Sequence, residues 1–218
     1  MLMINKINKL WLFVMSRFVQ FLLVSVMLVP IGAKAAQATC IEDKAALLEL
    51  DFMSFDQDFE GGWRAVADTP GCKPEAVKLI EAYQQQRTDL SDGMKHTLRL
   101  HQAQLHAELG HNEAAIALFR QSYKPDEQDR SGWNPYMDAT IAFIKKDKPK
   151  LVDAIARLKA VPRPEGFDPR DAEGNPIEVP WPPNLTIVES YLRCFDMNYV
   201  EVNVEGQCPR PKNDETAD

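Results

Sequence analysis

The chain has 218 residues and a formal net charge of −7, with 32 acidic and 25 basic side chains. This length suits a single domain and is large enough to bury a hydrophobic core. The acidic balance argues against nucleic acid as a partner, because the protein repels phosphate backbones, and it disfavours anionic lipid surfaces for the same reason.

The first 38 residues predict a secretory signal. Three cations at Lys6, Lys9 and Arg17 precede an apolar run over residues 18–33, and small residues then follow at the A-x-A spacing of a signal peptidase site. Arg17 limits the run to fewer than the roughly 20 apolar residues that a membrane-spanning helix needs. We therefore expect a periplasmic or extracellular protein with a mature N-terminus between residues 36 and 39, and no stable membrane insertion after cleavage.

Cleavage makes the chain more acidic. Residues 1–38 carry four cations and no acids, so the formal charge falls from −7 to −11. Two alternatives stay open at this end: translation could start at Met15, and Cys40 could accept a lipid. Lipidation is disfavoured because Thr39, not glycine or alanine, precedes the cysteine.

All four cysteines follow the predicted signal: Cys40, Cys72, Cys194 and Cys208. An even number in an oxidising compartment predicts two disulfides, for which three connectivities are possible. We expect the pairs 40–72 and 194–208, because each brackets one end of the domain. The chain has no C-x-x-C, so it shows neither a redox motif nor a zinc ribbon.

Residues 42–160 read as helical almost throughout. A first helix is predicted at 44–55, followed by a break at 59–63. Pro74 suits the first turn of the next helix, whose buried face repeats at i, i+3, i+4, i+7 through Ala76, Leu79, Ile80 and Tyr83.

Two helix pairs follow, at 94–109 with 112–123 and at 135–146 with 148–160. Gly110 suits the left-handed residue that ends a helix, while Asn112 and Asn134 suit N-caps. The two pairs align at a period of 36 residues, which places three residues of the first pair on three of the second: Ala103 on Ala139, Ala115 on Leu151, and Phe119 on Ile155.

In Ala103, Gly110, Ala115 and Phe119 this sequence resembles the tetratricopeptide repeat, whose period is about 34 residues. The resemblance covers residues 74–160. It implies an all-α fold of antiparallel helix hairpins, stacked as a short α-solenoid that binds a partner. The second repeat departs from the pattern, with Lys146 in place of glycine and Leu151 in place of alanine. The alternative is an ordinary helical bundle.

After residue 160 the composition changes. Seven of the 15 prolines fall in residues 162–183, which predicts an extended loop that wraps the helical domain. A terminal helix is predicted from the cap Asn184 through Phe195, and the alternation at 199–204 suggests a short strand. The domain organisation is therefore a signal (1–38), a helical domain (39–160), the wrap and terminal helix (161–208), and a disordered tail (209–218).

Two patterns imitate metal sites. His96, His101, His106 and His111 are evenly spaced, but five residues on a helix rotate by about 140°, so successive rings point to different sides. Asp56, Asp58 and Gly61 imitate the start of a calcium-binding loop, but position twelve is Ala67 where a bidentate glutamate is required. The sequence favours a solvated helix end there, and predicts neither a metal site nor a cofactor.

Motifs of common enzymes are absent, including G-x-S-x-G, the P-loop and G-x-G-x-x-G. The predicted function is therefore binding of a protein or peptide partner in the cell envelope. The rivals are an envelope hydrolase that uses Asp or Glu as acid and base, and a purely structural or inhibitory module. Aromatic residues dominate interfaces, so the candidate partner-binding residues are Trp63, Trp133, Tyr136 and Trp181, although in a chain this helical a core role is the favoured interpretation of large aromatics.

Overall fold

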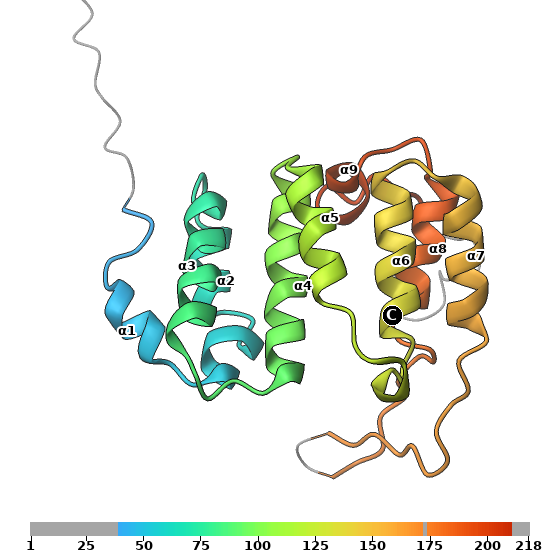
Figure 1. The fold of residues 1–218 in the computed structure, drawn as a ribbon, viewed down its shortest axis with the longest axis horizontal. Coiled ribbons are helices and arrows are strands. Elements are labelled where there is room, and N and C mark those ends of the chain that lie inside the picture. The colour runs from blue at the N-terminus through green and yellow to red at the C-terminus, as the bar shows by residue number, and fades with distance from the viewer. Residues whose placement is uncertain (1–38, 172–173, 211–218) are drawn as a thin grey trace, which may run out of the picture. The chain divides into compact units, whose positions relative to one another are not determined.

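The computed structural model describes residues 39–171 and 174–210, which are all-α apart from one isolated bridge between Arg170 and Pro176 (Figure 1). The predicted signal and residues 211–218 of the predicted tail lie outside the described residues. The elements are α1 Lys44–Glu49, the π-helix η1 Met53–Gln57, α2 Gly62–Asp68, α3 Lys73–Gln86, α4 Asp92–Glu108, α5 Asn112–Gln121, the 3-10 helix η2 Asp126–Gln128, α6 Trp133–Ile144, α7 Lys148–Lys159, α8 Leu185–Arg193 and α9 Tyr199–Asn203.

Helix α4 is shared by two hydrophobic clusters. Leu98 and Leu105 lie seven residues apart on one face and join the cluster formed with α1, η1, α2 and α3. A second face, at spacings of three and four, carries Leu100, Ala103 and Ala107 into the cluster formed with α5–α9. Residues at each of these spacings line one side of a helix. The apolar residues of α4 therefore form two separate contact faces, one for each cluster. None of the helices in the described part of the chain is long and apolar enough to span a membrane.

Each of the two predicted helix pairs is a hairpin, with α4 packed on α5 and α6 packed on α7 (Figure 1). Gly110 ends α4 at φ 75° and Lys146 ends α6 at φ 56°. In both turns the N–H of the following residue donates to the carbonyl five residues back, at 2.8 and 2.9 Å. This is the Schellman arrangement, which requires a left-handed residue. The prediction for Gly110 is confirmed, and Lys146 occupies the matching place.

A lysine in the left-handed conformation costs about 1–2 kcal/mol relative to glycine. The side chain of Lys146 offers a compensation, because its ammonium donates to the carbonyls of Phe195, at 2.7 Å, and Met197. It also lies 4.2 Å from the centre of the Phe143 ring. Lys146 thus ties the turn of the second hairpin to the chain after α8, which explains why this position holds a long cation.

The residues aligned at the 36-residue period are buried in both hairpins. Their exposed fractions are 0% for five of the six and 4% for Ile155, the set being Ala103, Ala115, Phe119, Ala139, Leu151 and Ile155. Ala115 on α5 is therefore a position without room for a larger side chain.

We expect Ala115→Leu to lower the free energy of unfolding by about 1–3 kcal/mol, because extra methylenes in a packed core force side chains and backbone to shift. The matched control is Ala117→Leu, on the exposed face of the same helix. Urea unfolding of both variants checks this. Equal stability of the two would show that α5 does not pack as described.

Several predicted boundaries need correction at the N-terminal side. The helix predicted at 44–55 ends at Glu49, because the Asp51 carboxylate accepts the N–H groups of Met53 and Ser54, at 2.8 and 3.1 Å, and starts the separate turn η1. Short polar side chains compete with helix continuation in this way. The predicted break at 59–63 contains the start of α2, a helix that the sequence analysis did not foresee.

The predicted N-caps were wrong by one or two residues. His111, not Asn112, precedes α5, and Gly132, not Asn134, precedes α6. The first N–H groups of α6 instead bond to Asp129, at 2.6 and 2.8 Å. Asn134 exchanges two hydrogen bonds with the backbone of Lys124, at 2.9 and 2.8 Å, and so fixes the loop that precedes α6.

The strand predicted at 199–204 was wrong, because this segment is helix α9. Asn198 and Glu201 form a capping box, in which each side chain accepts the other residue's backbone N–H, at 2.5 and 3.0 Å. This pattern is a helix-start signal that outweighs the alternation of valines. The terminal helix α8 begins after Asn184 as predicted and ends at Arg193, two residues before the predicted end.

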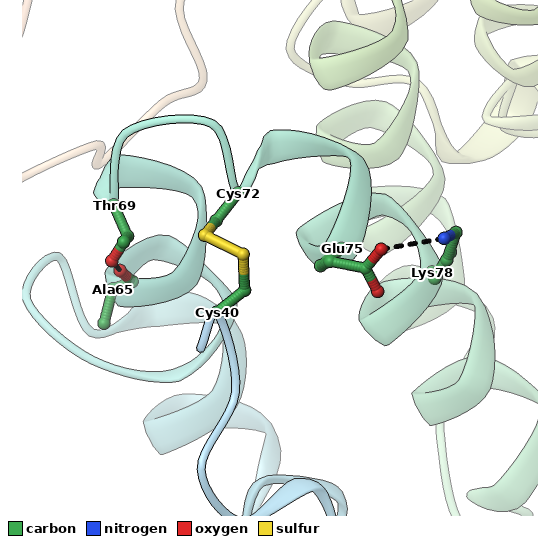
Figure 2. The surroundings of a disulfide bond; sticks show 6 residues. All are labelled: Cys40, Ala65, Thr69, Cys72, Glu75 and Lys78. Atoms are coloured by element: carbon green, nitrogen blue, oxygen red, sulfur yellow. Dashed lines mark hydrogen bonds and ion pairs between the residues drawn. A yellow bond between two sulfur atoms is a disulfide. The ribbon is translucent and has the colours of Figure 1, made fainter. Parts of the chain in front are cut away.

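Both predicted disulfides are confirmed, with Cα–Cα distances of 5.4 Å for Cys40–Cys72 and 5.8 Å for Cys194–Cys208. Figure 2 shows the first bridge joining the start of the described chain to Cys72, which precedes α3. On the loop-entropy model, sequence separations of 32 and 14 correspond to about 3.7 and 3.0 kcal/mol of stabilisation. The second bridge encloses α9 and holds it against α8.

The proline-rich segment is extended as predicted, but its described residues within 162–180 are mostly exposed, so the predicted wrap over the helices is not seen in this stretch. The chain returns to the helices through Trp181. The indole N–H of Trp181 donates to the carbonyl of Val161 at 3.0 Å, and its ring lies 5.1 Å from that of Phe167. Helix α8 follows and packs on both α6 and α7. The described residues from Thr39 onward belong to one compact unit.

Candidate functional site

A charged cleft of about 400 Å³ lies over α5, α6 and α7. Ile141 and Ala142 of α6 are its buried residues, with exposed fractions of 8% and 3%, and they form its floor. Charged and hydroxyl groups form its rim: Arg120, Tyr123, Asp138, Lys145, Asp147, Lys150, Asp153 and Arg157. We call this the α5–α7 cleft.

The carboxylates of the α5–α7 cleft are all engaged by neighbouring side chains. Arg157 bonds to both Asp138 and Asp153, at 2.9 and 3.0 Å. The carboxylate of Asp147 forms an ion pair with the ammonium of Lys150 at 2.9 Å. It also accepts the backbone N–H of Lys150 and so caps the start of α7. These acids are therefore held in place by cations of the same cleft.

The phenol O–H of Tyr123 also donates a hydrogen bond to the carboxylate of Asp138. Burial, together with the hydrogen bond to Asp138 and the negative charge of that group, raises the pKa of Tyr123 well above its usual value. The phenol therefore stays protonated near neutral pH and donates to the carboxylate. This contact links the end of α5 to the middle of α6 at one side of the cleft.

Two cations of the cleft differ from Lys150 and Arg157 in that they do not pair with these carboxylates. Arg120 of α5 and Lys145, which follows α6, are exposed, and neither makes an ion pair within the described ranges 39–171 and 174–210. Lys145 acts at longer range as one of the charges that lower the pKa of Asp147, after the stronger effect of Lys150. The α5–α7 cleft thus presents positive charge on a chain whose overall charge is negative.

A second cluster surrounds Asp56, the last but one residue of η1. Its carboxylate is fully buried and accepts hydrogen bonds from the indole of Trp63 at 2.9 Å, from His101 Nδ1 at 2.8 Å and from Gln57 at 2.5 Å. The interpretation of Asp56 as part of a solvated helix end was therefore wrong. Asp58, the other acid of the calcium-like pattern, is exposed, so the two carboxylates do not converge.

The hydrogen bonds decide the charge of this carboxylate. Burial by itself raises the pKa of Asp56, but the hydrogen bond and charge of His101, with the bonds from Trp63 and Gln57, hold the pKa below its usual value. Asp56 is therefore ionised near neutral pH. Because an ionised carboxylate only accepts hydrogen bonds, Nδ1 of His101 is the donor to Asp56, and Nε2 of the same ring lies 3.5 Å from the guanidinium of Arg64.

The backbone that brings Trp63 to Asp56 depends on Gly62. This glycine has φ 52°, and a Cβ atom on it would lie 2.0 Å from the carbonyl oxygen of Phe55. Only a residue without a side chain allows the chain to turn back so closely on η1. Arg64 then stacks on the Trp63 ring at 4.2 Å and donates to the carbonyl of Asp56. A π-helix turn such as η1 often marks a functional position.

The four aromatic residues predicted for partner binding lie in different places. Trp63 and Tyr136 are buried, with exposed fractions of 7% and 3%. Trp133 and Trp181 are half-buried, and each indole N–H donates to a backbone carbonyl, of Ser122 at 2.7 Å and of Val161 at 3.0 Å. Trp133 and Trp181 are therefore the two that retain surface for a partner, and none of the four lines the α5–α7 cleft.

Neither the α5–α7 cleft nor the Asp56–His101 pair was predicted from the sequence. The cleft residues come from three helices, and Asp56 and His101 are separated by 45 residues, so no local pattern marks either one. Comparisons of this chain with models of protein families, with curated proteins and with solved structures find no match.

Proposed function

We propose that the protein is an exported helical-repeat protein that binds a protein or peptide partner in the cell envelope, and that an acidic segment of this partner occupies the α5–α7 cleft. Export is supported by the pattern of the first 38 residues and by two disulfides, which persist in oxidising compartments. Stacked helix hairpins are a common scaffold for such binding surfaces.

The exposed cations of the cleft are the reason for proposing an acidic partner. Arg120 and Lys145 are exposed cations in a cleft whose carboxylates already have cationic or hydroxyl neighbours. Charge complementarity therefore favours carboxylates from outside. The apolar floor of Ile141 and Ala142 adds a contact for the aliphatic part of a peptide.

The rival function, an envelope hydrolase, rests on Asp56 as the buried carboxyl group. A general acid at neutral pH needs a raised pKa, whereas the pKa of Asp56 is lowered. Its oxygens are also engaged by three donors, and Nε2 of its partner His101 faces Arg64. The geometry of the Asp56 cluster therefore suits a structural link between η1, α2 and α4 better than acid-base chemistry.

Charge reversal tests the proposal. We expect a fluorescent peptide rich in Asp and Glu to bind the chain 39–218 in an anisotropy titration at low salt. The variant Arg120→Glu/Lys145→Glu should bind it about tenfold more weakly, since exposed charge pairs contribute up to about 1 kcal/mol each. Binding should also weaken as salt screens the charges.

The matched control is Lys44→Glu/Lys78→Glu, which changes the net charge equally at exposed positions outside the cleft. It should leave the affinity within about twofold of the parent. An equal loss in both variants would mean that net charge alone attracts the peptide. No binding by the parent, or full binding by the cleft variant, would contradict the proposed site.

A further inference from the structure

His106 and His111 face each other at the turn between α4 and α5. Their Nδ1 atoms are 3.3 Å apart, and their ring centres are 5.5 Å apart. His106 is half-buried in the last turn of α4, while His111 is exposed and precedes α5. The other two histidines lie earlier on α4, where His101 is bound to Asp56.

The backbone of the turn produces this pair. The N–H of His111 donates to the carbonyl of His106 at 2.8 Å, and the N–H of Gly110 donates to that of Ala107 at 3.1 Å. These are the two bonds of a Schellman motif, in which the side chains at the C3 and C″ positions come into contact. His106 and His111 occupy those two positions. Histidines five residues apart point to different sides only on an uninterrupted helix, and Gly110 ends the helix between His106 and His111.

We propose that His106 and His111 form a two-histidine binding site for a divalent transition-metal ion, with zinc as the ion whose geometry fits. Zinc–imidazole bonds of about 2.0–2.1 Å at a tetrahedral angle separate two ligand nitrogens by about 3.3–3.4 Å. The two Nδ1 atoms already have this separation, so binding requires little rearrangement of the turn.

The surroundings of the pair favour a cation. Glu81 on the neighbouring helix α3 acts on His106 as a negative charge and accepts a hydrogen bond from Gln85 at 3.3 Å. It supplies a favourable potential for a divalent ion near the pair.

The described residues contain no group of three histidine, cysteine or acidic side chains placed to hold one metal ion. The proposed site therefore has two protein ligands and leaves two tetrahedral positions for water or for groups from another molecule. In a structural zinc site the protein supplies all four ligands. A site with open coordination positions can instead exchange its ion or join it to a second molecule. The site is separate from the α5–α7 cleft and does not depend on the proposed function.

The experiment is calorimetric titration of the tag-free chain 39–218 with zinc chloride at pH 7.5. We expect one ion per chain, and at least tenfold weaker binding in His111→Ala, a change at an exposed position whose side chain makes no helix-cap bond. His106→Ala should weaken binding to the same extent. The matched control His96→Gln removes a histidine outside the pair and should bind zinc as the parent does.

A second readout uses cobalt, which replaces zinc and reports tetrahedral coordination by its visible absorption. Circular dichroism of each variant excludes unfolding as the cause of a loss. Two outcomes would overturn the proposal: zinc binding that survives in His106→Ala/His111→Ala, or no zinc binding by the folded parent. The second would show that the pair is held only by an N–H···N hydrogen bond between the rings.

Discussion

The variant Gly62→Ala should lose about 2–6 kcal/mol of unfolding free energy. A left-handed residue other than glycine costs about 1–3 kcal/mol, and a forced shift in a packed region costs about 1–3 kcal/mol more. The shift cannot be avoided, because the new Cβ would lie 2.0 Å from a backbone oxygen of η1. Moving this backbone also displaces Trp63 from Asp56. Urea unfolding of the chain 39–218 measures the loss.

Gly71→Ala is the matched control. Gly71 also has a positive φ, of 83°, but a Cβ there meets no atom within 4 Å. Only the conformational cost of about 1–3 kcal/mol then applies. The difference between the two variants isolates the close approach of Gly62 to η1. If both lost the same amount, the contact between α2 and η1 would not be as tight as described.

Asp56→Ala should cost about 3–5 kcal/mol, the loss typical of removing one partner from a buried charged network. The indole N–H of Trp63 and Nδ1 of His101 would lose their acceptor, and Arg64 would lose a nearby opposite charge. Asp58→Ala is the control, since this carboxylate is exposed two residues later and should cost far less. Thermal melting and urea unfolding of both variants compare them. Equal losses would contradict the buried network.

The cost of Asp56→Ala should depend on pH in one direction. The folded-state pKa of Asp56 is lowered, so its contribution is fully present above the unfolded value near 3.9 and is lost as the pH falls through the lower folded value. The stability difference between the parent and Asp56→Ala should therefore keep its full size near neutral pH and shrink below about pH 4. A difference that grows on acidification would contradict an ionised Asp56.

Much of the helical architecture could be predicted from local patterns. The bounds of α4 to α7 lie within about two residues of the predicted helices, and α3 begins one residue before Pro74, because apolar periodicity, a proline in a first turn and Gly110 after a helix act within a few residues of the chain. The disulfide pairs were also predictable, since cysteines at opposite ends of a domain leave few sensible pairings. The two helix pairs predicted at 94–123 and 135–160 each form a hairpin in the structure.

Errors arose where two local signals compete. In residues 199–204 the alternation of valines favoured a strand, but the capping box of Asn198 and Glu201 starts a helix there. The disulfide at Cys208 then holds that helix in place. In residues 44–55 a continuous helical pattern was interrupted by a single side chain, Asp51, which bonds to the backbone ahead of it. Neither result follows from hydrophobic spacing alone.

The sequence by itself therefore determined the helical class, the two hairpins, the disulfides and the pattern of an export signal. Only the tertiary structure decided that Asp56 is buried against His101, that Arg120 and Lys145 share a cleft, and that His106 meets His111. The physical reason is that helices arise from interactions within one or two turns, whereas each of these sites depends on how a turn or a neighbouring helix redirects the chain. Residues that are distant, or that point apart on an ideal helix, come together only when the backbone between them is folded.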